Sequence, residues 1–279
     1  MIKKLLKKFI PAGGPVVDLD DNISANIKKF QQSISKPSIK NYSRSENWEK
    51  KIEVVVPCFN HAPYLKAAFR SIADQSYKGP LSVTFINDAS TDNSLEVMNH
   101  IKKRNSDKRM PIKVINNASN PNQAASINKA AKESRNELIV ILNADDLLTP
   151  DCLDLIIATY KNNPDIAMLG GSSLWFEKDK KLPKFSPEKF KEFKIEKIWP
   201  KDAAHFTKLN DINMSQSSCS FFKAAWELVG GYFEKDKRVC SYDDRDFQMR
   251  VCSVLPIGIY EDYPMEFYRV DSSQGRATV

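Results

Sequence analysis

The chain has 279 residues, 42% of them hydrophobic, which is enough to bury a full core in one large domain or two small ones. Lys and Arg number 42 against 35 acidic residues, but no basic stripe with interleaved aromatics runs along the sequence, so we expect no nucleic-acid partner. The five cysteines are odd in number and form no CxxC pair, which argues against a disulfide framework or structural zinc and favours a reducing, cytoplasmic compartment.

Residues 1–50 are predicted to form a leader ahead of the globular part. Its first ten residues carry four lysines and no acid, with apolar residues at helical spacing between them. Such a basic amphipathic segment can lie on an anionic membrane surface, which predicts peripheral contact of residues 1–10 with the inner face of a membrane. The alternative is a short solvated helix, or one that docks on a partner. No apolar run reaches about 18 residues, so we expect no transmembrane helix.

From residue 51 onwards, apolar runs and helical periods alternate. The predicted strands are 52–57, 81–86, 112–115 and 138–142, and the predicted helices between them are 64–73, 94–103 and 123–133. This alternation is typical of an α/β domain with a largely parallel sheet. A helix at 152–162 and a strand at 166–170 follow. The pattern then loosens into a loop or helical excursion over 176–202, and the last predicted elements are a strand at 217–222, helices at 223–229 and 242–252, and a strand at 256–260.

Acidic or polar residues follow the predicted strands at the ends where an open α/β sheet binds its ligand. Asp145 and Asp146, which come directly after a buried strand, repel each other unless a cation, hydrogen-bond donors or water offset their charge. Carboxylates bind Mg²⁺ or Mn²⁺ together with phosphate and water, so the pair indicates a phosphorylated substrate. The alternative is an acidic loop that caps the next helix, since Thr149-Pro-Asp151 is a fair helix start.

Several other classes of enzyme are excluded by missing motifs. Neither G-x-G-x-x-G nor G-x-x-x-x-G-K occurs, which argues against a Rossmann dehydrogenase and a P-loop enzyme. Signatures of a Ser or Cys nucleophile are missing as well, and the three histidines form no recognisable triad.

The order of the motifs resembles family 2 of the inverting glycosyltransferases, which have the GT-A fold. The matching motifs are Val-Val-Val-Pro-Cys-Phe-Asn (54–60), Ile-Asn-Asp-Ala-Ser-Thr-Asp (86–92), Val-Ile-Leu-Asn-Ala-Asp-Asp (140–146), Gly-Gly-Tyr-Phe (230–233), Tyr-Asp-Asp-Arg-Asp (242–246) and Tyr-Arg (268–269). The resemblance implies a GT-A (Rossmann-like), mostly parallel sheet flanked by helices, with a smaller acceptor-side subregion. Residues 51–155 would bind the nucleotide-sugar donor, and residues 156–279 would form the acceptor-binding half of the same domain.

The resemblance also assigns residues to the sugar donor. Pro57 and Phe59 match the motif that cradles the nucleobase, and Asp88 matches the acid that accepts a hydrogen bond from a uracil-type N–H, which favours a UDP-sugar. Asp88 could instead simply begin a turn, because Asn-Asp-Ala-Ser is strong turn chemistry. Asn122 lies in the matching donor-side segment 120–130, where many relatives carry glycine and an arginine that this chain lacks, so the donor sugar cannot be copied from them.

The same resemblance assigns the metal and the catalytic base. Asp146 is the expected ligand of Mg²⁺ or Mn²⁺, with Asp145 as its neighbour beside the diphosphate, although Asn143 stands where many relatives have the first Asp of the motif. Asp244 is the expected base that takes the proton from the acceptor hydroxyl. The alternative for Asp244 is a simple dipole partner in the first turn of a helix.

The resulting hypothesis is a metal-dependent inverting glycosyltransferase that moves a sugar from a nucleotide-diphosphate donor to a hydroxyl of a glycan or a lipid-linked acceptor. Two alternatives stay open: a non-catalytic module that binds nucleotides or glycans, and a nucleotidyltransferase. Trp175, Trp199 and Trp226 could supply a surface for sugar stacking, or they could be core or lid residues.

Overall fold

The computed structural model describes residues 51–105, 110–177, 180–190, 194–203, 212, 214–234 and 243–270. The leader predicted over residues 1–50, with its basic segment 1–10, lies outside the described residues, and so does Tyr242 at the predicted start of the last helix. None of the helices in the described ranges has both the length and the apolar character that crossing a membrane requires.

The first half of the domain alternates strands and helices as the sequence predicts. Its elements are β1 (Ile52–Cys58), α4 (Ala62–Ala73), β2 (Leu81–Asn87), α5 (Ser94–Arg104), β3 (Ile112–Asn116), α6 (Gln123–Glu133) and β4 (Leu138–Ile141). All seven residues of β1 are buried, because β1 lies between two parallel neighbours and is covered on both faces. The strand order β3-β2-β1-β4 places the carboxyl ends of these parallel strands along one edge of the sheet.

The second half extends this sheet with a mixed pattern of pairing. Its elements are β5 (Leu147–Leu148), α7 (Cys152–Asn162), β6 (Met168–Glu177), a 3₁₀ turn η1 (Pro187–Phe190), β7 (Glu196–Ile198), α8 (Pro200–Ala203), β8 (Ser220–Phe222), α9 (Lys223–Val229), α10 (Asp243–Cys252) and β9 (Ile257–Val270). The order continues as β4-β8-β6-β9-β5, with β7 also on β9. Only β6 and β9 pair in parallel here, so the sheet is parallel in its first half and mixed beyond β4.

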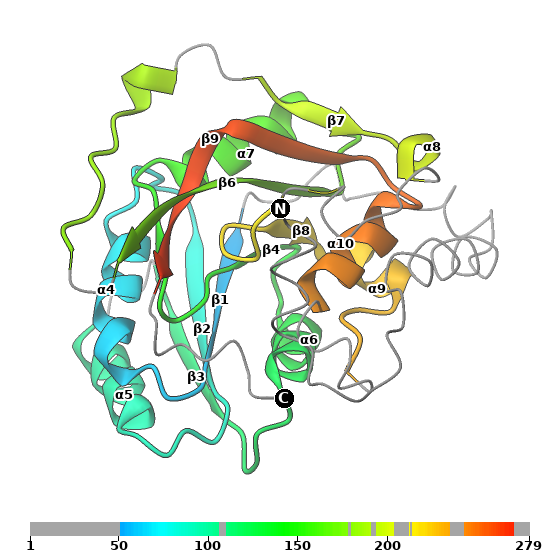
Figure 1. The fold of residues 1–279 in the computed structure, drawn as a ribbon. Helices are drawn as coiled ribbons and strands as arrows, with labels where there is room; N and C mark the ends of the chain where they lie inside the picture. Colours follow the sequence, from blue (N-terminus) through cyan, green and yellow to red (C-terminus); the bar gives the residue numbers. More distant parts are fainter. Residues whose placement is uncertain are drawn as a thin grey trace, which may run out of the picture.

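Helices cover both faces of the sheet, which confirms the predicted α/β architecture (Figure 1). On one face, α4, α5 and α7 pack their apolar side chains, such as Leu65, Met98 and Ile156, against β1 and β2. On the other face, α6, α9 and α10 do the same with residues that include Ile127 and Phe247. The two long strands β6 and β9 run together across the top of this sandwich in Figure 1 and end beside α4.

One asparagine joins α6 of the first half to the turn after α9 in the second half. The Asn128 carboxamide donates a hydrogen bond to the Tyr232 carbonyl and accepts one from the Tyr232 N–H, both at 2.8 Å. It also accepts a hydrogen bond from the Trp226 indole at 2.8 Å. Gly231, with φ of +73°, brings the backbone close enough for these contacts, since a Cβ there would lie 2.6 Å from the Asn128 oxygen. The Gly-Gly-Tyr motif is therefore explained by this junction.

We predict that Asn128→Ala lowers the free energy of unfolding by about 2–4 kcal/mol, because the substitution removes these three hydrogen bonds and a fourth to the Glu234 carboxylate, and leaves the backbone and indole partners unsatisfied. Urea denaturation followed by tryptophan fluorescence measures the change. Asn105→Ala, which removes a single hydrogen bond to the Ile101 carbonyl at the end of α5, should cost less than about 1 kcal/mol. Equal losses in the two variants would contradict the proposed junction.

Candidate functional site

The loop after β1 is held to the loop after β2 at the carboxyl edge of the sheet. Asn60, with φ of 58°, accepts hydrogen bonds from the N–H groups of Thr91 at 2.7 Å and Asp92 at 3.3 Å. Pro57 is buried within β1, whereas the Phe59 side chain directly after the strand is 44% exposed. An exposed aromatic ring at this edge is a suitable surface for a flat ligand.

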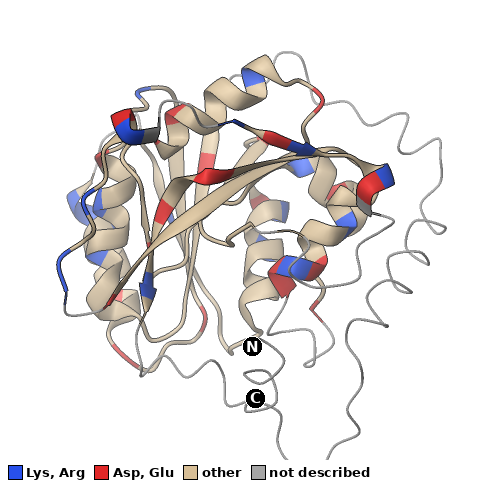
Figure 2. Ribbon diagram, turned by 45° about the horizontal axis from the view of Figure 1, so that its top comes forward, with Lys and Arg blue, Asp and Glu red and all other residues tan. Residues whose placement is uncertain are grey.

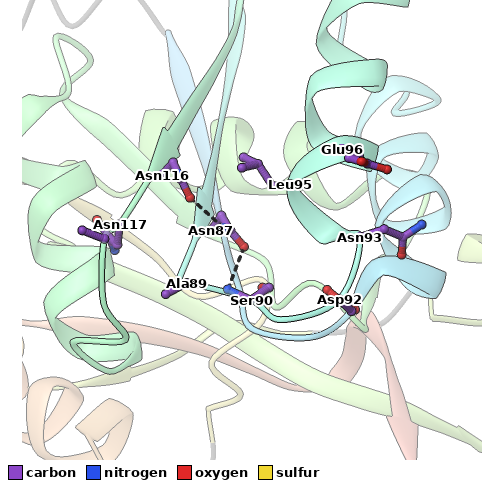
Figure 3. A pocket seen from close by; sticks show the side chains of 10 residues that line it. Asn87, Ala89, Ser90, Asp92, Asn93, Leu95, Glu96, Asn116 and Asn117 are labelled. Atoms are coloured by element: carbon purple, nitrogen blue, oxygen red, sulfur yellow. Dashed lines mark hydrogen bonds between the residues drawn. The ribbon is translucent and has the colours of Figure 1, made fainter.

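A polar pocket of about 440 Å³ lies between the ends of β2 and β3 and the start of α5 (Figure 3). Asn87 spans part of its wall, because its amide donates a hydrogen bond to the Asn116 Oδ1 at 2.7 Å and its Oδ1 accepts one from the Ser90 N–H at 3.3 Å. Asn117, Asp92 and Glu96 also line the pocket. Its lining therefore offers amide and carboxylate groups for hydrogen bonding.

Asp88 lies beside this pocket and is only 3% exposed. Its Oδ1 accepts hydrogen bonds from the Asn117 amide at 2.9 Å and from the Ser126 hydroxyl, and Lys129 donates to Asn117 at 2.9 Å behind them. Burial raises the pKa of the Asp88 carboxyl above its ordinary value, while Ser126, Asn117 and Lys129 act in the opposite direction. Asp88 thus has partners on α6 and after β3, which the alternative interpretation of Asp88 as a simple turn residue does not require.

Asn122 has a structural role at the start of α6. It is the N-cap of this helix, with φ of 91°, and its Oδ1 accepts a hydrogen bond from the Ala125 N–H at 2.9 Å. Its amide donates to the Glu234 carbonyl at 3.2 Å. The nucleotide-binding role that the sequence predicts for Asn122 stays a prediction, and its capping role explains the residue type by itself.

The acid pair after β4 is asymmetric in its exposure. Asp146 is 1% exposed, and its two oxygens accept hydrogen bonds from the Arg269 N–H at 2.9 Å and the Ser217 hydroxyl at 2.7 Å. Burial and the neighbouring charge of Asp145 raise the pKa of Asp146 to about 7. The Asp145 side chain is 14% exposed, and its Oδ1 lies 3.9 Å from the His61 Nδ1 after β1. Asp145 is therefore the more accessible carboxylate of the two.

A second buried acid, Glu266, lies behind this pair and was missed in the sequence. Its side chain is fully buried on β9, and Oε1 accepts a hydrogen bond from the Ser173 hydroxyl at 2.6 Å, whereas Oε2 has no hydrogen-bond partner. Burial and the charge of Asp146 raise the pKa of Glu266 well above its ordinary value. The one signal for it in the sequence is a carboxylate within the apolar run Met265-Glu-Phe267.

Arg269 connects β9 to the acid pair and to α4. Its Nε donates to the Asp145 carbonyl at 2.8 Å, and its guanidinium lies 4.5 Å from the ring centroids of both Tyr64 and Phe176. A guanidinium held between two rings is well positioned by cation–π attraction. Since the Arg269 N–H also binds Asp146, this one residue fixes both the backbone and the side chain of the acid pair.

The second pair, Asp243 and Asp244, opens α10, and Figure 2 shows acidic residues at this helix start. Asp243 is 8% exposed, and burial and the charge of Asp244 raise its pKa to about 7. Burial also raises the pKa of Asp244, although Arg245 opposes this. The Asp244 Oδ1 accepts a hydrogen bond from the Arg245 N–H at 2.8 Å, as an acid that only supports the helix start would.

Two acids of the site, Asp244 and Glu266, lie near the same buried thiol. Cys219 is on the segment that follows Ser217, and besides burial the charges of both Asp244 and Glu266 raise its pKa. The Arg245 guanidinium donates to the Met214 carbonyl at 2.6 Å and so ties α10 to the same segment. The polar residues that follow β1, β2 and β4 are thus joined by direct contacts. The acid pair at the start of α10 is linked to them through residues 214–219.

The acid pair Asp145 and Asp146 fits a divalent cation that completes its coordination with phosphate and water. Within the described ranges, no three His, Cys, Asp or Glu side chains form a group that could hold a metal ion by themselves. Asp145 and Asp146 offer hard carboxylate oxygens next to each other, and Mg²⁺ or Mn²⁺ commonly uses one or two such groups with phosphate and water. Burial and the neighbouring charge of Asp145 raise the pKa of Asp146, and a bound cation would act in the opposite direction by favouring the ionised carboxylate.

Comparison with known proteins decides the family. The model of "Glycosyl transferase family 2" matches residues 53–228, which is more than half of the chain. The chain belongs to glycosyltransferase family 2. This glycosyltransferase is 28% identical over 206 residues to the chondroitin synthase of Pasteurella multocida, a match that covers 69% of this chain and 18% of the synthase. It is 25% identical over 121 residues to the poly-beta-1,6-N-acetyl-D-glucosamine synthase of Staphylococcus epidermidis, covering 43% and 28% of the two chains.

Solved structures confirm the GT-A fold of this glycosyltransferase. TarS from S. aureus in complex with UDP-GlcNAc has a TM-score of 0.64 at 19% identity, covering 82% of this chain and 61% of that chain. The mannosyltransferase from Pyrobaculum calidifontis, in complex with GDP-Man and Mn²⁺, has a TM-score of 0.56 at 14% identity and covers 91% and 66%. The chain spans only 18% of the chondroitin synthase, so the likeness concerns this domain and not the larger relative.

The raised pKa of Asp243 predicts a pH-dependent effect of Asp243→Asn on the stability of this glycosyltransferase. Between about pH 4 and about pH 7, the folded state keeps a proton that the unfolded chain has released, so the carboxyl lowers stability progressively as the pH rises. We therefore expect Asp243→Asn to be more stable than the parent by about 1–3 kcal/mol at about pH 8, and nearly equal to it at about pH 4.

Urea titrations at the two pH values measure this difference for Asp243→Asn. Asp165→Asn, which removes the partner of Lys197 at 3.1 Å, serves as the control and should change stability by less than about 1 kcal/mol at either pH. A stability difference for Asp243→Asn that does not grow with pH would contradict the raised pKa of this buried side chain.

Proposed function

We propose that this glycosyltransferase moves a sugar from a nucleotide-diphosphate donor, with UDP as the favoured nucleotide, to a hydroxyl of a glycan or lipid-linked acceptor, with inversion of the anomeric carbon. The main support is the arrangement of two acid pairs around one segment of the structure, residues 214–219. One pair suits a cation and a diphosphate, and the other supplies a carboxylate with a raised pKa for proton transfer.

The nucleobase would lie at the ends of β1 and β2. The exposed ring of Phe59 offers a stacking surface, and Pro57 shapes the backbone below it. Asp88 would accept a hydrogen bond from a uracil-type N–H, since an ionised carboxylate accepts only. Its position beside the 440 Å³ pocket supports this role, whereas its burial means that a small movement of Ser126 or Asn117 must accompany binding.

The diphosphate would lie at Asp145 and Asp146. Asp146 is the residue we assign to Mg²⁺ or Mn²⁺, with Asp145 beside it, and a bound cation would offset negative charge on the departing nucleoside diphosphate. The backbone N–H of Arg269 and the Ser217 hydroxyl hold Asp146 in place before any ligand binds. Holding the carboxylate rigidly reduces the rearrangement needed during the reaction.

Asp244 would act as the general base. The acceptor oxygen forms a bond to the anomeric carbon while the bond from that carbon to the diphosphate oxygen breaks, and the diphosphate leaves with the electron pair. Asp244 takes the proton of the acceptor hydroxyl, and attack from the face opposite the leaving group inverts the configuration. Because burial raises the pKa of Asp244, its basicity is greater than that of a solvent-exposed aspartate.

Two other functions explain the site less well. A nucleotidyltransferase would require a glycine-rich, Arg- or Lys-containing loop after the first strand, whereas this chain has Cys58-Phe-Asn-His-Ala-Pro63 there. A non-catalytic module that binds nucleotides or glycans would not need buried acids with raised pKa at both ends of the site, because such groups reduce stability.

We predict that Asp244→Asn lowers the rate of sugar transfer by about 100-fold or more, since the amide cannot take the proton of the acceptor hydroxyl. Release of nucleoside diphosphate from a panel of UDP- and GDP-sugars, measured with Mn²⁺ and glycan acceptors, reports this rate. The matched control on the same helix is Asp246→Asn, whose carboxylate pairs with Arg250 at 2.6 Å and should retain most activity. Full turnover by Asp244→Asn would contradict the base assignment, and binding of donor without turnover by the parent would favour the binding module.

A further inference from the structure

A pair of aromatic rings, the exposed Trp175 and the half-buried Tyr268, lies between the acid site and solvent. Trp175 on β6 is 67% exposed, the largest exposed fraction among the large hydrophobic residues of the described ranges. It pairs in register with Tyr268 on β9, and the two ring centroids lie 5.6 Å apart with their planes at 44°. Leaving an indole in water forgoes a large gain from burial, so a surface of this kind is more typical of a binding site than of a scaffold.

Strand geometry places these rings on the same face as Glu266. Side chains alternate between the faces of a strand, and Ser173 and Glu266, two residues before the rings on β6 and β9, contact each other through a 2.6 Å hydrogen bond. The intervening residues lie on the opposite face, where Phe176 and Arg269 pack together. Trp175 and Tyr268 therefore continue the face that Glu266 presents toward the Asp146 site.

Exposure increases steadily along this face away from the acid site. Glu266 is fully buried and Ser173 is partly buried, whereas Trp175 and the next residue on the same face, Glu177, are exposed. Two residues of a strand span about 7 Å, so the aromatic pair begins within one short step of the buried acids. The face thus forms a continuous path from Asp146 to solvent, with aromatic rings followed by the charged pair of Glu177 and Lys180, 2.9 Å apart.

We propose that Trp175 and Tyr268 form a stacking platform for a pyranose ring of a glycan acceptor, a proposal that rests on the function proposed above. The C–H face of a sugar packs on aromatic rings, while its hydroxyls need polar partners at the rim, which Ser173 and Glu177 provide on either side. The two rings meet at an angle of 44° and form one bent surface against which a sugar ring can pack. A chain that ends at the acid site would lie across this platform as it leaves toward solvent.

Another exposed indole provides a matched control. Trp199 is 42% exposed, but it lies between β7 and α8, and its backbone N–H donates a hydrogen bond to the nearby Asp202 carboxylate at 3.0 Å. Trp199 lies outside the paired strands β6 and β9 and therefore does not continue the face on which Glu266 lies. Removing the Trp199 ring takes away a comparable aromatic surface without touching the platform, so the effect of position is separated from the effect of losing an exposed tryptophan.

The test measures binding of a β-1,6-linked N-acetylglucosamine pentasaccharide and of cellopentaose by calorimetry, to the full chain with UDP and Mn²⁺ present. We expect at least one oligosaccharide to bind, Trp175→Ala to weaken it by about tenfold or more, and Trp175→Phe to restore most of the affinity. Trp199→Ala should bind like the parent. Because Trp175 is exposed, Trp175→Ala should fold, and unchanged UDP binding verifies this.

Three results would overturn the platform: neither oligosaccharide binds, Trp175→Ala binds as tightly as the parent, or Trp175→Ala changes only the oligomeric state in sedimentation, which would indicate a protein contact. The outcomes separate this proposal from the proposed function. Loss of glycan binding in Trp175→Ala in a protein that turns over no nucleotide sugar would support the platform and contradict the transferase. Normal turnover of nucleotide sugar, together with unaltered glycan binding in Trp175→Ala, would support the transferase and contradict the platform.

Discussion

The burial of carboxylates at the carboxyl edge of the sheet is the constraint on which the rest of this structure depends. Asp146 and Glu266 are almost inaccessible to water, and each needs hydrogen-bond donors that the surrounding strands must supply. Ser217 comes from the segment before β8, Ser173 from β6, and the N–H of Arg269 from β9. The second half of the sheet, with its mixed strand directions, thus brings these hydrogen-bond donors to the carboxyl ends of the parallel strands in the first half.

This constraint explains the long strands of the second half. β9 spans 14 residues, and its last third must reach past β5 to place Arg269 against Asp145 and Asp146. Its partner β6 follows it over ten residues with irregular register near Ser172, which restores the alternation that places Ser173 beside Glu266. The same geometry positions Trp175 and Tyr268 on the face that leads away from the buried acids, so site and platform share one structural cause.

The sequence predicted the first half of the fold well, because its β-branched runs and helical periods are uninterrupted. The strand predicted at 81–86 and the helix predicted at 123–133 agree with β2 and α6 to within one residue. It predicted β6 and β9 as short strands, since Gly170-Gly-Ser-Ser173 interrupts the apolar pattern of β6, and the polar residues near Asp262 and the buried Glu266 interrupt that of β9. Asp88, Asp145 and Asp244 could be found by motif order, but the burial of Asp146 depends on Arg269 and Ser217, two distant residues that no local pattern connects to it.

We propose that Asp146 binds a divalent cation that carries a nucleoside diphosphate, and calorimetric titration of UDP with and without Mn²⁺ measures this binding. At about pH 8, where Asp146 is largely ionised, Mn²⁺ should strengthen UDP binding by about tenfold or more. Asp146→Asn should abolish this gain and leave the weak metal-free binding of UDP unchanged, while Asp165→Asn should behave like the parent. UDP binding that is equally strong without Mn²⁺, or a full gain from Mn²⁺ in Asp146→Asn, would show that Asp146 is not the metal ligand.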